Sequence, residues 1–171
     1  MAQGECPTPR RVAVVGAGAA GTLTAIHLAA GCTGGRRGES MEILLVDPAE
    51  RAGRGVAYST TDDRHLLNVP AKGMSALPDQ PHHFLDWLCR HVDSRTCPGD
   101  FARRSDLAAY LDDTLQTVVA DTDGVTVVHR RTRATGLTVR DGAVDLTLAD
   151  GSQLRADAAV VAPGVFAGAP R

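Results

Sequence analysis

Two aliphatic runs, separated by a glycine-rich turn and a helical repeat, open the sequence. Residues 11–15 and 41–47 consist mostly of β-branched residues and leucine without regular polar alternation, which is typical of strands buried on both faces of a parallel sheet. Between them, Leu23, Ile26 and Ala30 recur at helical spacing. We therefore predict a strand, a helix and a second, parallel strand over residues 10–47.

The periodicity is lost over residues 48–80, where glycine, proline, serine, threonine and aspartate accumulate. An irregular segment of this length inside a compact domain is usually functional. Helical spacing returns over residues 81–120, which are long enough for two helices, and Ser105 is the expected N-cap of the second helix.

Short strands are predicted in the last third of the chain. Three runs of strand-forming residues occur at 125–128, 136–140 and 143–148, and Asp-Gly pairs at 141–142 and 150–151 mark tight turns after the last two. This pattern predicts an antiparallel β-meander over residues 125–155. A further aliphatic run, within residues 157–164, predicts a strand that returns to the parallel sheet.

Together these elements predict an α/β fold of the Rossmann-like type, with three layers that include a parallel sheet and an antiparallel β-meander. The 171 residues are the usual length of a single domain, which we place at residues 1–171. Hydrophobic residues make up 43% and charged residues 22% of the chain, as in ordinary folded domains. This composition excludes collagen-like, mucin-like and acidic disordered proteins.

The charge and the apolar runs exclude two classes of partner. The formal net charge of −2 provides no positive surplus for a polyanion, so we expect no nucleic-acid partner. The chain contains no apolar run long enough to cross a bilayer, so we expect no membrane partner and a cytoplasmic location.

No metal site is expected. The four cysteines, at positions 6, 32, 89 and 97, match neither a redox C-x-x-C pair nor a zinc ribbon. His83 and His91 flank Cys89 on a predicted helix, but their spacing does not place them on neighbouring turns of one face.

The strongest chemical signal is a GxGxxG motif between the first strand and its helix. In such a motif the first glycine permits a tight turn, the second leaves room for a pyrophosphate, and the third lets the helix pack closely on the strand. The backbone N–H groups and the helix dipole then attract the anion, and residues 16–28 contain no acid that would repel it. The candidate cofactor-binding residues are therefore Gly16, Ala17, Gly18, Ala19, Ala20 and Gly21.

Asp47 ends the second strand, 26 positions after Gly21, and is expected to accept hydrogen bonds from the ribose of an adenosine. An acid at this position disfavours a ribose 2′-phosphate, which leaves FAD or NAD(H) as the ligand. A glycine turn that only packs a helix on a sheet is the alternative, and the ordered arrangement of strand, turn, helix and acid disfavours it. The predicted β-meander favours FAD, by analogy with the architecture of flavoproteins.

Further motifs carry a resemblance to a known family. The run from Gly53 to Tyr58 reads GRGVAY, and the run from His65 to Pro70 reads HLLNVP and is followed by Met74. With the GxGxxG motif, these segments resemble the bacterial FAD-NAD(P)-binding proteins related to N-hydroxylating flavin monooxygenases, including aspartate N-monooxygenases. The resemblance covers residues 12–164. Four later positions also resemble the family: Phe101, Arg104, Tyr110 and Leu111.

The sequence departs from the family pattern at three positions. Arg103 and Ala108 replace a proline and a glycine, and Pro163 stands where a small hydroxyl residue is usual.

The resemblance implies that FAD is the cofactor, that Gly55 belongs to the cofactor-binding set, and that residues 48–80 lie on the flavin side. It implies NAD(P)H as the reductant only in a complete enzyme, because no second glycine motif follows Gly21. The family's FAD domain also closes with a final strand and helix that we expect this sequence to lack.

We therefore expect the FAD-binding portion of a flavin-dependent NAD(P)H oxidoreductase, specifically an amine N-hydroxylating monooxygenase. The 171 residues are not expected to be catalytically competent alone, and a C-terminal remainder or a partner subunit would complete the enzyme. Catalytic residues are not assigned. The alternative is a noncatalytic adenine-dinucleotide-binding module, or a truncated gene product, that acts through a partner chain.

Overall fold

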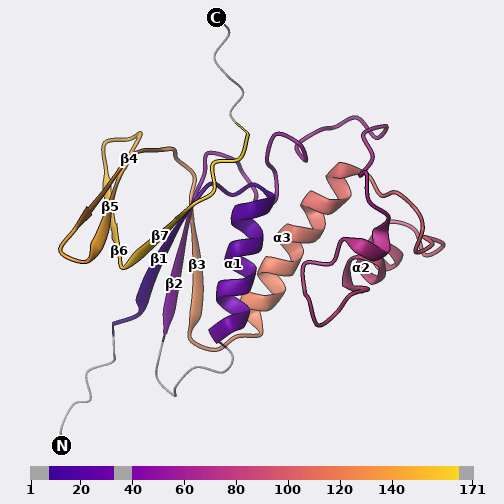
Figure 1. Ribbon diagram of the computed structural model, residues 1–171, viewed down its shortest axis with the longest axis horizontal. Helices are drawn as coiled ribbons and strands as arrows, with labels where there is room; N and C mark the ends of the chain where they lie inside the picture. The colour runs from indigo at the N-terminus through magenta and orange to yellow at the C-terminus, as the bar shows by residue number, and fades with distance from the viewer. Residues whose placement is uncertain (1–7, 33–39, 166–171) are drawn as a thin grey trace, which may run out of the picture.

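A four-stranded parallel sheet forms the centre of the computed structural model, which describes residues 8–32 and 40–165. Its strands lie in the order β3-β2-β1-β7, and every neighbouring pair is parallel (Figure 1). The strands are β1 (Arg10–Val15), β2 (Met41–Val46), β3 (Val125–Arg130) and β7 (Ala158–Val161). The parallel pairing of the first two strands confirms the strand–helix–strand unit predicted from the sequence.

Two helices cover one face of this sheet. Helix α1 (Ala19–Gly31) follows β1 and packs along α3 (Arg104–Ala120) (Figure 1). Small residues at Gly21, Ala25 and Ala29 are buried on α1, so its axis can approach the sheet closely. Every second residue of the central strands points into this layer, where the core includes Val14, Ile43, Leu45, Leu111 and Leu115.

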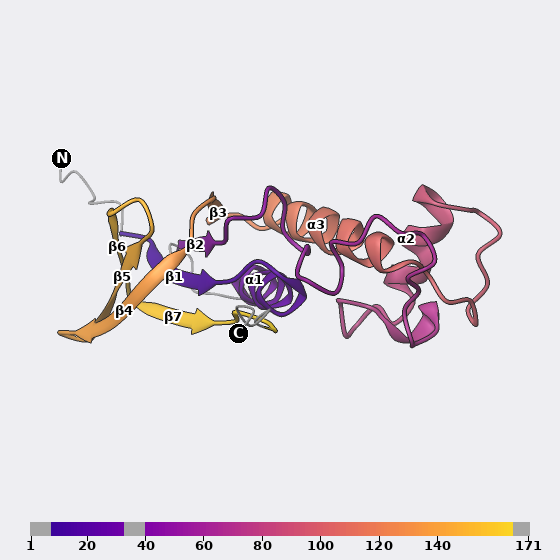
Figure 2. The ribbon, with the colours of Figure 1, turned by 90° about the horizontal axis from the view of Figure 1, so that it is seen from above.

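An antiparallel sheet covers the opposite face. It consists of β4 (Ala134–Arg140), β5 (Ala143–Leu148) and β6 (Gln153–Ala156) in sequence order. The alternate residues of the central strands meet it in a second core of Ala13, Leu44, Val46, Leu146, Leu148, Leu154 and Ala156. Figures 1 and 2 show the resulting three layers, which confirm the predicted α/β fold class.

The predicted extent of the β-meander is wrong at its start. Residues 125–130 form β3, which pairs in parallel with β2 and therefore belongs to the central sheet. The physical reason is burial on both faces: Val125 and Val127 pack in the helix-side core, whereas Val128 packs against the β-meander. The β-meander itself comprises only β4, β5 and β6.

The predicted N-cap of α3 is also wrong. The N-cap is Arg103, and Ser105 lies inside the first turn. The carboxylate of Asp106 accepts a hydrogen bond from the backbone N–H of Arg103 at 3.3 Å, so the helix start is stabilised by Asp106 instead of a serine hydroxyl.

The predicted irregular segment contains one short 3₁₀ helix, η2 (Ala71–Gly73), and is followed by α2 (His83–His91). Its first part lies beside the turn that precedes α1, and its later part runs beside the start of α3 at the end of the molecule opposite the β-meander (Figure 2). Two backbone hydrogen bonds fix it there: the N–H of Leu67 donates to Ala102 at 2.8 Å, and the N–H of Arg104 donates to His65 at 2.9 Å. Apart from η2, the segment is thus ordered by tertiary contacts.

Candidate functional site

The GxGxxG turn lies at the carboxyl edge of the parallel sheet, where the chain order of the strands reverses. From β1 the chain crosses to β2 on one side, while β7 lies on the other side of β1. Ligands of open α/β sheets bind in the crevice outside such a reversal point. Gly16 occupies this point, because its added Cβ would lie 2.2 Å from the carbonyl oxygen of Ala162, just beyond β7.

Gly16 and Gly21 are required by the local geometry. Gly16 has a φ of +100°, in the region that favours glycine, and its N–H donates to the Val46 carbonyl at 2.8 Å. A Cβ on Gly21 would lie 1.8 Å from the Gly16 carbonyl oxygen, so α1 approaches the turn more closely than any side chain would allow. These contacts are the tight turn and close helix packing that the motif predicts.

The first turn of α1 presents free donors to the crevice. Within the part of the chain that the structure describes, the backbone N–H groups of Ala19, Ala20 and Gly21 have no hydrogen-bond acceptor. The first turn carries no acidic residue, and no side chain caps it. Free N–H groups at the positive end of a helix bind phosphate oxygens, so this turn fits the diphosphate of a dinucleotide.

Gly18 and Gly55 face each other across this turn. A Cβ on Gly18 would lie 3.4 Å from the Gly55 Cα, and a Cβ on Gly55 would lie 3.3 Å from the Gly18 Cα. The fold therefore brings a glycine of the irregular segment to the GxGxxG motif, 37 positions away in sequence. A side chain on either glycine would enter the space between them, and both glycines belong to the cofactor-binding set expected from the sequence.

Asp47 also lies at this edge and is half-buried. One carboxylate oxygen accepts the N–H of Ala17 at 2.8 Å, and the other accepts the N–H of Ala49 at 2.7 Å. The side chain therefore holds the GxGxxG turn against the end of β2, a role that the sequence motif did not predict. Each oxygen retains a further lone pair, so the carboxylate can still accept a hydrogen bond from a ligand hydroxyl.

A groove of about 510 Å³ opens beside Asp47, between α3, β3 and the residues that follow β2. The ring of His129 in β3 contacts the Asp47 carbonyl oxygen through Nε2 at 3.2 Å, which connects the groove to the site. Its floor is aliphatic and its rim is polar; among the lining residues are Leu45, Arg51, Leu115, Gln116, Val127, His129 and Arg131. Sequence patterns did not identify this groove, because its walls come from three separate elements.

The GRGVAY segment is fixed by close backbone packing. Gly53 has a φ of +78°, and its added Cβ would lie 2.5 Å from the carbonyl oxygen of Ala108 in α3. Ala108 stands where the family carries glycine, and its side chain is buried. The N–H of Gly53 donates to the Ala17 carbonyl at 2.9 Å, which joins this segment to the GxGxxG turn.

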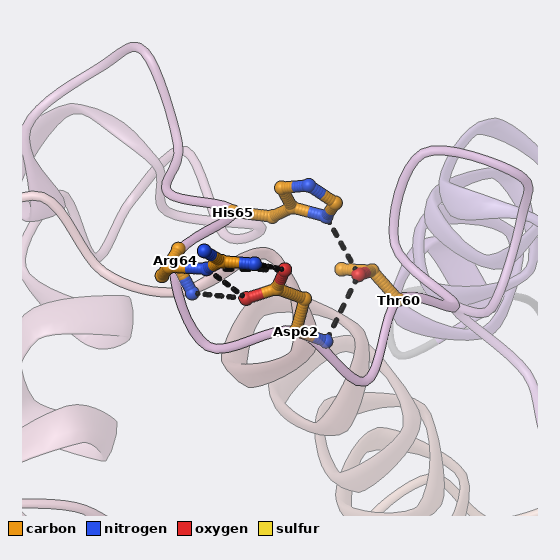
Figure 3. A network of polar contacts seen from close by, with 4 residues as sticks. All are labelled: Thr60, Asp62, Arg64 and His65. Atoms are coloured by element: carbon orange, nitrogen blue, oxygen red, sulfur yellow. Dashed lines mark hydrogen bonds and ion pairs between the residues drawn. The ribbon is translucent and has the colours of Figure 1, made fainter.

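A polar network shapes the turn between the GRGVAY and HLLNVP segments (Figure 3). The Thr60 hydroxyl contacts His65 Nδ1 at 2.7 Å and accepts the N–H of Asp62 at 3.1 Å. Side-chain and backbone hydrogen bonds from Arg64 lower the pKa of Asp62 to about 2. All of these groups belong to residues 60–65, so the network stabilises the turn locally.

The later family-like positions serve mainly to hold the irregular segment. The guanidinium of Arg104 donates through Nε to the Leu66 carbonyl at 3.1 Å. Tyr110 is fully buried, and its hydroxyl accepts the N–H of Ala76 at 2.9 Å and contacts His83 Nδ1 at 2.8 Å. Burial lowers the pKa of His83, with a smaller contribution from Arg90. Phe101, in contrast, is 48% exposed.

Metal sites and membrane spans were sought over residues 8–32 and 40–165. No group of three or more histidine, cysteine, aspartate or glutamate side chains in these ranges is arranged to hold a metal ion. None of the helices found there is long and apolar enough to cross a membrane. Cys32, Cys89 and Cys97 are free thiols, and Cys6 lies outside the described residues.

Comparison with solved structures shows the same fold in several longer proteins. A flavin-containing monooxygenase from Stenotrophomonas maltophilia matches with a TM-score of 0.58 and 19% identity, over 91% of this chain and 38% of that chain. FqzB matches with a TM-score of 0.60 and 19% identity, over 94% of this chain and 38% of that chain. The halogenase PltM matches with a TM-score of 0.56 and 16% identity, over 91% of this chain and 34% of that chain.

These matches show a shared fold, and the chain spans little more than a third of the length of these proteins. No curated protein matches the sequence. A family model described as FAD-NAD(P)-binding matches residues 13–166, which include the GxGxxG turn, Asp47, the irregular segment and both sheets. The chain therefore belongs to the FAD-NAD(P)-binding family.

Proposed function

We propose that this chain forms the FAD-binding portion of a flavin-dependent NAD(P)H oxidoreductase. The observation that carries the proposal is the cradle, the start of α1 where the free backbone N–H groups of Ala19, Ala20 and Gly21 lie beside the closely packed Gly18 and Gly55. Free N–H groups at the positive end of a helix, next to backbone that carries no side chains, suit a diphosphate. The family and the flavin enzymes of the same fold support FAD as the dinucleotide.

The described residues would hold FAD in two parts. The N–H groups of Ala19, Ala20 and Gly21 would bind the diphosphate, and the remaining lone pairs of Asp47 would accept a ribose hydroxyl. The groove beside His129 lies next to Asp47, so the adenine would extend toward its aliphatic floor. When bound, FAD supplies the redox chemistry, which consists of accepting reducing equivalents from NAD(P)H and passing them on.

The specific reaction we propose is N-hydroxylation of an amine. The support for it is the resemblance of the GRGVAY and HLLNVP segments to N-hydroxylating flavin monooxygenases, together with the shared fold of a flavin-containing monooxygenase. The elements that bind NAD(P)H and substrate would come from a C-terminal remainder or a partner subunit. We place the enzyme in the cytoplasm, and we assign no catalytic residue within this chain.

The cofactor proposal is tested by titrating the chain with FAD, ADP and NAD⁺ and measuring each dissociation constant by calorimetry. ADP should bind, because it carries the diphosphate and adenosine for which the described residues are suited, whereas FAD should bind this chain weakly and the natural full-length protein more tightly. FAD should bind more tightly than NAD⁺. Failure of both FAD and ADP to bind would contradict the assignment of the cradle, and tighter binding of NAD⁺ than of FAD would contradict the choice of cofactor.

The reaction requires a separate test on the natural full-length enzyme, loaded with FAD. Incubation with NADPH, oxygen and an amine substrate should yield a product heavier by one oxygen atom, detected by mass spectrometry. The same reaction without the amine is the control. Oxidation of NADPH without oxygen transfer to any amine in an amino-acid panel would contradict N-hydroxylation, while leaving FAD binding intact.

A further inference from the structure

Thr22 connects the two glycine segments of the site through one buried side chain. Its hydroxyl is fully buried; it donates to the Ala17 carbonyl at 3.1 Å and accepts the N–H of Gly53 at 2.8 Å. The backbone N–H of Thr22 donates to the Gly18 carbonyl at 2.9 Å. A single residue of α1 therefore contacts the GxGxxG turn twice and the GRGVAY segment once.

We propose that Thr22 is a positioning residue that locks the GxGxxG turn to the GRGVAY segment and so fixes the width of the cofactor cradle. The inference rests on the proposed function, because it takes that cradle to be the dinucleotide site. The motif itself assigns no role to this position, which follows the third glycine.

Backbone hydrogen bonds connect Gly53, which Thr22 holds, to Gly55 at the proposed cofactor site. The N–H of Gly55 donates to the Gly53 carbonyl at 3.2 Å, so the position of Gly53 sets the position of Gly55. The Gly55 carbonyl in turn accepts the N–H groups of Tyr58 and Ser59 at 2.9 and 3.0 Å. Because Gly55 faces Gly18, a shift at Gly53 changes the space into which the diphosphate must fit.

The contacts also indicate that the hydroxyl can be removed without unfolding the chain. The N–H of Gly53 is shared between the Thr22 hydroxyl and the Ala17 carbonyl, so it keeps one acceptor when the hydroxyl is lost. The Ala17 carbonyl likewise keeps the Gly53 N–H. Valine has nearly the shape of threonine and suits a fully buried position, so Thr22→Val should fold and lose only the two hydrogen bonds of the hydroxyl, to the Ala17 carbonyl and from the Gly53 N–H.

The experiment compares Thr22→Val with Thr22→Ser and with a matched control, Thr114→Val. Thr114 is also a buried helical threonine, but its hydroxyl donates only to the Tyr110 carbonyl of its own helix, at 2.7 Å. Two quantities are measured on each chain: the dissociation constant for ADP by calorimetry, and the hydrogen exchange rate of the Gly53 amide by NMR without ligand.

Loss of the lock should weaken ADP binding about five- to tenfold in Thr22→Val, the range that one net hydrogen bond supplies. The Gly53 amide should exchange faster than in the wild type by a similar factor. Thr22→Ser keeps the hydroxyl, and Thr114→Val lies outside the site, so both should stay within about twofold of the wild type for ADP binding.

Three outcomes would overturn the proposal. Wild-type exchange of the Gly53 amide in Thr22→Val would show that the hydroxyl does not lock the segments. Faster exchange with unchanged ADP affinity would show that the lock does not set the cradle. Faster exchange in a chain whose wild type binds neither ADP nor FAD would place the lock outside a dinucleotide site, and would contradict the proposed function separately.

Discussion

Two single substitutions in the GxGxxG motif should separate cofactor binding from folding. Gly18 has a φ of −68° and a ψ of −173°, an extended conformation that any residue can adopt. Its added Cβ would lie 3.4 Å from the Gly55 Cα, an ordinary van der Waals distance. The backbone at this position therefore accepts a Cβ, and the two further methyl groups of Gly18→Val add bulk beside the proposed diphosphate site.

Gly21 provides the contrast within the same motif. Its added Cβ would lie 1.8 Å from the Gly16 carbonyl oxygen, so Gly21→Ala must push α1 away from the turn. Overpacking of this kind costs about 1–3 kcal/mol, which lowers the melting temperature of a domain of this size by about 2–12 °C. Gly18→Val replaces the N-cap glycine with a poor N-cap residue, so it should lower the free energy of unfolding by about 1 kcal/mol.

The assay measures both properties for wild type and the two variants. Thermal unfolding followed by circular dichroism gives the melting temperature, and calorimetric titration with ADP gives the affinity. Gly18→Val should weaken ADP binding at least about a hundredfold, which corresponds to about 2.7 kcal/mol, because a branched side chain displaces phosphate contacts. Its melting temperature should stay close to that of the wild type.

Two results would refute this reasoning. Equal ADP affinity of the wild type and Gly18→Val would show that the diphosphate does not approach Gly18. A Gly21→Ala variant as stable as the wild type would show that the close contact between α1 and the turn is not required.

Three further predictions concern Asp47, His83 and the interface between the two sheets. Asp47→Ala should lower the free energy of unfolding by about 1–3 kcal/mol and weaken ADP binding, because the N–H groups of Ala17 and Ala49 lose their acceptor; unchanged stability in urea unfolding would contradict this. Burial lowers the pKa of His83 in the folded chain, so the unfolded chain binds a proton more readily. The stability contributed by neutral His83 should be present above about pH 6.5 and should decrease as the pH falls through the pKa of the folded chain. In urea unfolding, the wild type should therefore lose more stability than His83→Gln between pH 7.5 and 5.5. Leu44→Ala should lower the free energy of unfolding by about 2–4 kcal/mol, because Leu44 is 4% exposed between the sheets. Val139 is 68% exposed, so Val139→Ala should change this free energy by less than about 0.5 kcal/mol. Similar losses for the two variants would contradict the observed packing.

Local patterns predicted the parts of the fold that depend on neighbouring residues. The first two strands and the GxGxxG turn lie where the apolar runs and glycines placed them, because burial of a strand and a positive φ at a turn act within a few residues. The resemblance of the GRGVAY segment added Gly55, which periodicity alone did not identify. The family match over residues 13–166 covers both segments.

The local pattern did not predict which strands pair with each other. Residues 125–130 and 134–140 both have a high propensity for strand formation, and their order along the chain suggested a single β-meander. Only the tertiary structure shows that β3 is covered on both faces and pairs with β2, whereas β4 is largely exposed and pairs with β5. The partner of a strand depends on which faces other elements cover, and this is not encoded in the strand's own period.

The site shows the same division between local sequence and tertiary contact. The sequence by itself determined a glycine-rich turn before a helix and an acid at the end of the next strand, since both follow from residue type and spacing. Only the tertiary structure decided that Asp47 holds Ala17, that Gly55 faces Gly18, and that the Thr22 hydroxyl reaches Gly53. These contacts join residues 30 to 37 positions apart, and they form because packing of α1 against the sheet and α3 brings separate segments close together.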